Sequence, residues 1–69
     1  MTRQPVKSSN LKSVGYDPNT GTMEVEFHSG AVHQYHDVLP HHHTKLVAAK
    51  SPGAYFHAEI RDKHKSTPL

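Results

Sequence analysis

Histidine is the residue type in this chain best suited to chemistry, because neutral imidazole is a common ligand for zinc, copper and nickel. The chain contains eight histidines, at positions 28, 33, 36, 41, 42, 43, 57 and 64. The consecutive residues 41–43 would point about 100° apart around a helix, and His33 and His36 would lie on opposite faces of a strand. No two histidines have the H-x-x-x-H spacing that places two rings on one helix face. The spacing therefore predicts no metal site and no cofactor.

Hydrolytic chemistry is disfavoured on similar grounds. Serine, histidine and aspartate are all present, but no G-x-S-x-G motif places a serine on a strained turn. Cysteine is absent, which excludes disulfides, a cysteine nucleophile and thiolate zinc sites. Glu24 and Glu26 share one strand face, where we expect them to be solvated carboxylates on the outside of the sheet. The sequence predicts a protein that is not an enzyme.

Basic residues suggest a different kind of function. The net charge is +2, but the charges are unevenly distributed: residues 13–44 carry four acidic side chains and no lysine or arginine. Three basic residues precede this segment, and five basic residues and two acidic residues follow it. Basic ends can hold a polyanion, although solvated surface charge produces the same pattern. The candidate RNA-binding residues are Tyr35, Lys45, His57, Arg61 and Lys65. A tyrosine could stack on an unpaired base or pack in the core, and basic side chains could contact phosphates.

The elements that must position these residues are clearest at 22–36. Residues 22–27 alternate apolar and polar side chains, which is typical of a half-buried strand, and residues 31–36 form the returning strand after Ser29 and Gly30. A two-residue loop would pair Phe27 with Val32, whereas a three-residue loop would pair Phe27 with Ala31 and turn His33 and Tyr35 toward the core. We favour the three-residue loop with Gly30 in the left-handed region, because serine fits that conformation poorly.

A further strand precedes this hairpin. Val14 and Tyr16 share one face of it, whereas Leu11 has the opposite parity, so Gly15 marks a bulge or a close approach of backbone. The segment D-P-N-T-G at 17–21 has strong turn chemistry and predicts a reversal into the next strand.

The second half of the chain predicts two short helices. We expect Asp37 to cap the first helix, whose buried stripe comprises Leu39, His42 or His43, Leu46 and Ala49. Residues 51–53 end this helix, and Ser51 caps the next one. The second helix places Tyr55, Phe56 and Ile60 on its inner side and a Glu59–Lys63 pair outside.

Together these elements predict an α+β fold: a three-stranded antiparallel β-meander followed by two short α-helices packed on one face, in the order β-β-β-α-α. Residues 8–64 form the domain, and residues 1–7 and 65–69 are expected to be flexible tails. No apolar run approaches the ~20 residues of a membrane helix, and the first residues lack the apolar region of a signal peptide. We expect a soluble, cytoplasmic protein without membrane contact.

Several motifs, in collinear order, resemble the KTSC domain, a family named after the C-terminus of certain lysyl-tRNA synthetases and also found as separate bacterial and phage proteins. These motifs are S-S-N at 8–10, V-G-Y-D at 14–17, M-E-V-E-F-H-S-G at 23–30, V-H-Q-Y-H-D-V at 32–38 and S-P-G-A-Y-F-H-A-E-I-R at 51–61. The resemblance implies a small α+β domain, and RNA binding is the function suggested for the family from the synthetase context.

The chain departs from the family pattern mainly by acquiring histidine. The family's Y-x-Y is His33-Gln34-Tyr35 here, an aromatic of the first helix is His43, and Y-F-N is Tyr55-Phe56-His57. The usual Val-Pro before that helix is Val38-Leu39, with Pro40 one place later. We predict a binding module with RNA as its ligand; a protein-interaction or accessory domain that uses a sheet face or edge strand is the alternative.

Overall fold

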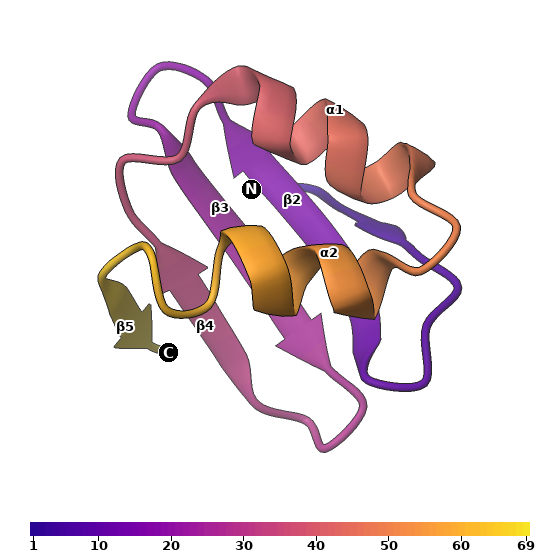
Figure 1. Cartoon of the computed structure of the whole chain (residues 1–69). Helices are drawn as coiled ribbons and strands as arrows, with labels where there is room; N and C mark the ends of the chain where they lie inside the picture. The colour runs from indigo at the N-terminus through magenta and orange to yellow at the C-terminus, as the bar shows by residue number, and fades with distance from the viewer.

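The computed structural model describes all 69 residues as an antiparallel sheet with two helices on one face (Figure 1). The sheet has five strands, in the order β1-β2-β3-β4-β5. Their bounds are β1 Arg3–Pro5, β2 Leu11–Asp17, β3 Thr22–Phe27, β4 Val32–Tyr35 and β5 Ser66–Pro68. The helices are α1, Pro40–Ala48, and α2, Pro52–Glu59. The predicted class and the helical face are confirmed.

The predicted number of strands is wrong. The segments that we assigned to tails contain β1, which pairs with β2, and β5, which pairs with β4. Each of these edge strands is three residues long and contains a proline, so neither has the alternating pattern from which a strand is recognised. Their place in the sheet depends on pairing with β2 and β4, which are distant from them in the sequence.

The hairpin register is the predicted one. Val25 pairs with His33 and Met23 with Tyr35, and the amide of Phe27 donates to the carbonyl of Ala31. Gly30 has a φ of 96°, a left-handed conformation that glycine adopts without strain. The three-residue loop therefore turns Tyr35 toward the core, as expected.

Two irregularities in strand β2 explain how Leu11, which is out of step with Val14 and Tyr16 in the sequence, reaches the same face of the sheet and why position 15 is glycine. The register shifts between Leu11 and Ser13, so Lys12 forms a bulge that lets Leu11 face the core together with Val14. Gly15 marks a close backbone approach, because a Cβ atom there would lie 2.8 Å from the carbonyl oxygen of Thr2. The bulge and the close approach both occur, at different residues.

The entry to α1 differs from the prediction. Asp37 is not the cap: it has a φ of 57°, and Leu39 occupies the N-cap position without a side-chain hydrogen bond. This turn directs Val38 into the core, where its amide donates to the carbonyl of Gly21 and its carbonyl accepts from the Tyr16 hydroxyl. Leu39 is consequently 59 % exposed, whereas Val38 is 2 % exposed.

The second helix follows the prediction. The Ser51 hydroxyl accepts a hydrogen bond from the amide of Ala54, and Lys63 lies 3.8 Å from Glu59. Phe56 lies in the middle of the core, with its ring edge-on to the rings of Phe27 and Tyr35 at 5.6 and 5.2 Å. The buried core comprises Leu11, Val14, Met23, Val25, Tyr35, Val38, Leu46, Phe56 and Ile60.

Candidate nucleic-acid interface

A groove lies between the turn at residues 8–10 and the start of α2, two segments found at the same end of the molecule (Figure 1). The Ser8 hydroxyl accepts hydrogen bonds from the amides of Asn10 and Leu11, which fixes the turn. Gly53 lets α2 approach this turn, since a Cβ atom there would lie 3.0 Å from the Ser8 hydroxyl. Four lysine, arginine and histidine side chains line the groove: Lys7, Lys50, His57 and Arg61. We call these side chains, with residues 8–10, Ser51, Gly53 and Ala54, the basic groove.

His57 and Arg61 act together at one end of the basic groove. One terminal guanidinium nitrogen of Arg61 lies 3.0 Å from Nδ1 of His57. Because a guanidinium can only donate, Nδ1 of His57 is the acceptor, and this contact requires the unprotonated nitrogen. Nε of Arg61 also lies 3.5 Å from a carboxylate oxygen of Asp62, and both of these side chains are exposed. The helical spacing of four residues thus orients the guanidinium along α2.

All the charged side chains that line the basic groove are positive. Lys7, Lys50 and Arg61 line it, and none of the six acidic residues of the chain does. Neighbouring cations without a lining carboxylate attract anions, and the attraction weakens with salt because the groove is open to water.

The structure brings together only two of the five predicted RNA-binding residues. His57 and Arg61 lie in the basic groove, whereas Lys45 belongs to α1 and Lys65 lies next to β4, where its carbonyl accepts from the amide of His36. Tyr35 is 5 % exposed, so its ring packs in the core and is not available to a base. Burial also raises the pKa of the Tyr35 hydroxyl above its ordinary value, with nearby Arg61 partly opposing the shift.

Sequence reasoning missed Lys7, and it counted Lys50 among the basic residues that could hold a polyanion without including it in the predicted site. Lys7 lay in a segment assigned to a tail, and Lys50 lies in the short connection between the helices. The run of basic residues without an acid at positions 1–12 was the available signal, but it does not show where that segment docks.

The other two tyrosines are engaged within the domain. The Tyr16 hydroxyl donates to the carbonyl of Val38, and its ring stacks on His43 at 5.3 Å. The Tyr55 hydroxyl lies 2.9 Å from Nδ1 of His42. Any ligand in the basic groove therefore meets charged and polar groups, with no tyrosine ring to stack on.

The histidines mostly hydrogen-bond to other parts of the domain. His28 contacts the carbonyl of Ser8 at 2.8 Å, His36 the hydroxyl of Thr67 at 2.8 Å, and His64 the carbonyl of His36 at 3.0 Å. No three histidine, aspartate or glutamate side chains are arranged to hold a metal ion. These contacts connect the sheet to the connecting turns and to β5.

Partial burial changes the proton affinity of two histidines on α1. Burial lowers the pKa of His42, and the nearby His41 and His64 lower it further. Burial also lowers the pKa of His43, whose Nε2 atom has no hydrogen-bond partner. Both side chains therefore favour the neutral form in the folded protein.

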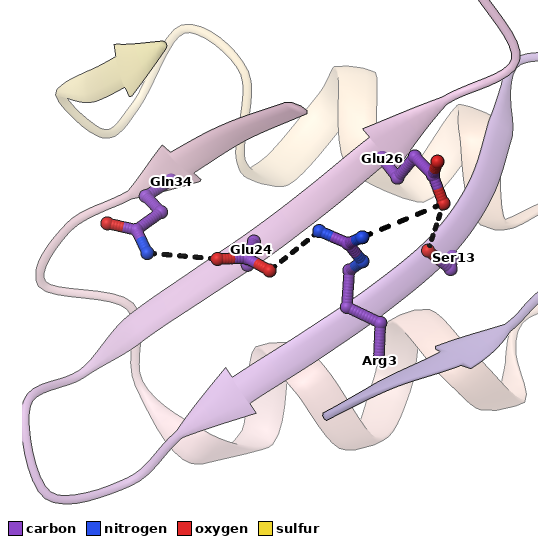
Figure 2. Close-up of polar contacts among 5 residues, drawn as sticks. All are labelled: Arg3, Ser13, Glu24, Glu26 and Gln34. Carbon is purple, nitrogen blue, oxygen red and sulfur yellow. Dashed lines mark hydrogen bonds and ion pairs between the residues drawn. The ribbon is translucent and has the colours of Figure 1, made fainter. Parts of the chain in front are cut away.

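The face of the sheet without helices carries a polar network (Figure 2). Arg3 lies 2.7 Å from one carboxylate oxygen of Glu24, and the Gln34 amide donates to the other at 3.0 Å. The Ser13 hydroxyl donates to Glu26 at 2.9 Å, and Arg3 lies 4.0 Å from the same oxygen. The expectation of solvated carboxylates is wrong, because β1 places Arg3 over the sheet and leaves Glu24 only 7 % exposed.

Gly15 makes this network possible. A Cβ atom at position 15 would lie 3.1 Å from Cγ of Arg3, so a larger residue would obstruct the path by which Arg3 crosses β2 to reach Glu24. The two carboxylates are thereby tied to partners on three other strands and form part of the structure of the sheet.

The family model of the KTSC domain matches residues 7–64. An uncharacterized protein of Stutzerimonas stutzeri is 41 % identical over 64 residues, covering 93 % of this chain and 90 % of that protein. A lysine–tRNA ligase of a Nostoc species is 36 % identical over 63 residues, which are 91 % of this chain but 11 % of the ligase.

A solved structure agrees in fold along almost the entire chain. The crystal structure of a KTSC domain protein from Yersinia pestis has a TM-score of 0.95 and 34 % sequence identity, and the match covers 99 % of this chain and 96 % of that one. No helix here has the length and apolar character needed to cross a membrane. The family model, the related sequences and the shared fold together establish that this chain belongs to the KTSC domain family.

Proposed function

We propose that this KTSC domain is a non-enzymatic module that binds single-stranded RNA through the phosphates of the RNA backbone, using the basic groove. The observation that carries the proposal is the uniform charge of that groove: Lys7, Lys50 and Arg61 line it, and no carboxylate does. Lysine and arginine side chains that neutralise phosphates supply most of the affinity in sequence-independent binding of nucleic acids.

The relatives support RNA over other polyanions. Three of them are named lysine–tRNA ligase, and the matching region is 11 % of each of those proteins. The name of these relatives includes tRNA, so a domain that forms part of them would lie close to RNA. A cytoplasmic location is part of the proposal, because RNA ligands of this kind are present there.

The expected binding has little dependence on base sequence. Sequence-specific recognition of RNA relies on splayed bases that stack on aromatic rings and hydrogen-bond along their edges. The three tyrosines are occupied by the core or by hydrogen bonds within the domain. Contacts to phosphate therefore dominate in this proposal.

A protein partner receives less support from the structure. Both edge strands are three residues long and contain a proline, which makes them poor templates for pairing with another chain. The sheet face without helices is covered by paired charges rather than by an apolar patch.

Salt-dependent titration of matched charge variants tests the proposal. The variant Lys7→Gln/Lys50→Gln/Arg61→Gln removes the three cations of the basic groove, and the control Lys45→Gln/Lys63→Gln/Lys65→Gln removes three from outside it. The two variants have the same net charge, so a difference between them reports position rather than overall charge.

The groove variant should bind a mixed-sequence RNA oligomer weakly, and its slope of log affinity against log salt should be smaller by about 2, since each phosphate contact on a single strand contributes about 0.7. The control should keep a slope close to that of the unmodified chain. Equal slopes for both variants would refute the groove as the site. Absence of binding by the unmodified chain at low salt up to about 100 µM, weaker than ordinary non-specific affinity, would refute RNA binding itself.

A further inference from the structure

His57 is the residue of the basic groove whose charge can change near neutral pH. Histidine gains or loses a proton between about pH 5 and about pH 8, whereas lysine and arginine are positive throughout that range. Apart from the lysines and Arg61, the other residues that line the groove are serine, asparagine, glycine and alanine, which carry no charge. The protonation of His57 therefore decides whether the groove presents three cations or four.

The contact between His57 and Arg61 exists only when Nδ1 of the histidine carries no proton. Nη1 of Arg61 lies 3.0 Å from Nδ1 of His57, and the guanidinium is the donor. A proton on Nδ1 places two donors and two positive charges opposite each other, so this contact is lost. The imidazolium then has two N–H groups, and Arg61 has one N–H group released from its partner. Protonation thus converts a closed contact into a pair of cationic donors that require an acceptor.

The surroundings of His57 offer no carboxylate as that acceptor. The charged and titratable groups on the segments that form the groove and its rim are Lys7, His28, Lys50, Arg61 and Asp62. His28 is engaged with the carbonyl of Ser8 at 2.8 Å. Asp62, the acidic member, lies 3.5 Å from Nε of Arg61, but it does not line the groove. An anionic ligand is therefore better suited than any lining side chain to neutralise the added charge.

We propose that His57 makes RNA binding by the basic groove depend on protons, because the protonated ring and Arg61 together donate to one phosphate of the RNA backbone. The inference rests on the proposed function and assigns the regulation of the same site. Hydrogen bonds from cations to a phosphate are charge-assisted, and the phosphate oxygens can accept from more than one donor. The affinity for RNA therefore rises as the pH falls, and RNA binding takes up protons, since linked equilibria are reciprocal.

Fluorescence anisotropy at about pH 8 and about pH 6 tests the proposal on both sides of the histidine titration range. The probe is a mixed-sequence RNA oligomer without a terminal phosphate, because a terminal phosphate itself titrates near pH 6. Lowering the pH should raise the affinity of the unmodified chain about twofold to fourfold more than that of His57→Gln, the range of one exposed charge pair. Glutamine keeps an oxygen that can accept from Arg61, but it cannot be protonated.

The salt dependence gives a second measurement. In the unmodified chain, the slope of log affinity against log salt should be steeper at the lower pH by up to about 0.7, the contribution of one phosphate contact on a single strand. His57→Gln should lack this change. His41→Gln is the matched control, because it removes an exposed histidine of α1 that does not line the groove, and it should keep the behaviour of the unmodified chain. Circular dichroism at each pH separates weaker binding from unfolding.

The outcomes separate this inference from the proposed function. A pH dependence that His57→Gln retains in full, or that His41→Gln reduces to the same extent, would overturn the role of His57 while RNA binding stands. Weaker binding of the folded chain at the lower pH would overturn it as well. Absence of binding at both pH values would overturn the proposed function and this inference together.

Discussion

Replacing Arg3 with alanine should destabilise the domain, although Arg3 lies in a segment without any strand pattern in its sequence. The side chain of Arg3 is 29 % exposed and that of Glu24 is 10 % exposed, at a distance of 2.7 Å. Removing one partner of a buried ion pair costs ~3–5 kcal/mol, whereas exposed pairs contribute ~0–1 kcal/mol. The intermediate exposure of Arg3 places the expected cost at about 2 kcal/mol.

This loss is large for so small a chain. A domain of 69 residues has a free energy of unfolding of about 3–10 kcal/mol. Urea denaturation followed by far-ultraviolet circular dichroism measures the change, since the chain has no tryptophan to report on unfolding. Arg61→Ala is the matched control: its pair with Asp62 is exposed on both sides, so its cost should be below about 0.5 kcal/mol.

Two further variants test whether the loss of the Arg3–Glu24 pair is the cause of the expected destabilisation. Adding Glu24→Gln to Arg3→Ala should recover part of the stability, because the double variant no longer buries an unpaired charge. Gly15→Ala should displace β1, because a Cβ atom there would lie 2.8 Å from the carbonyl oxygen of Thr2, and its cost should be less than additive with that of Arg3→Ala, since both changes disrupt the Arg3–Glu24 pair. A denaturation midpoint of Arg3→Ala equal to that of the unmodified chain would refute the reasoning, since the Arg3–Glu24 pair would then contribute nothing to stability.

Three other predictions concern the core, the histidines and metals. Phe56→Ala should cost about 3–5 kcal/mol and leave the chain largely unfolded in circular dichroism, because Phe56 is 1 % exposed; a wild-type-like urea curve would contradict the packing of α2. Stability should fall as the pH drops below about 6.5, because the lowered pKa values of His42 and His43 mean that the unfolded chain binds more protons there. Thermal melts from about pH 7.5 to about pH 5 measure this dependence, and His42→Gln/His43→Gln should flatten it; an unchanged profile in that variant would assign the effect to other groups. A chelator should leave the unfolding midpoint in metal-containing buffer unchanged, and a fall of many degrees would reveal a structural metal.

Local patterns were sufficient to predict the central part of the fold. The alternation at Met23, Val25 and Phe27 predicted β3, and the poor fit of serine to the left-handed region selected the correct loop at Gly30. Ser51 was recognised as a cap from its neighbours alone. These features depend on residues only a few positions apart, so the sequence contains the whole of the physical cause.

The edges of the sheet and the entry to α1 were decided by tertiary contacts. β1 and β5 are too short to show a period, and they pair with strands that are distant from them in the sequence. The capping chemistry of Asp37 was overridden because Val38 is held in the core by Gly21 and Tyr16. A helix cap at Asp37 would contribute less to the stability of the fold than the burial of the Val38 side chain together with the two hydrogen bonds to the Val38 backbone.

In the candidate site, too, some features follow from residues close together in the sequence and others depend on tertiary contacts. The spacing of four residues in the sequence was enough to predict that His57 and Arg61 lie close together, although Arg61 lies just beyond the end of α2. The sequence does not show that Lys7 and Lys50 join them, since this depends on which segments meet when the sheet and helices pack. A side chain's exposure and its distant neighbours are properties of the packed chain, and only the tertiary structure brings four residues spread from position 7 to position 61 into one groove.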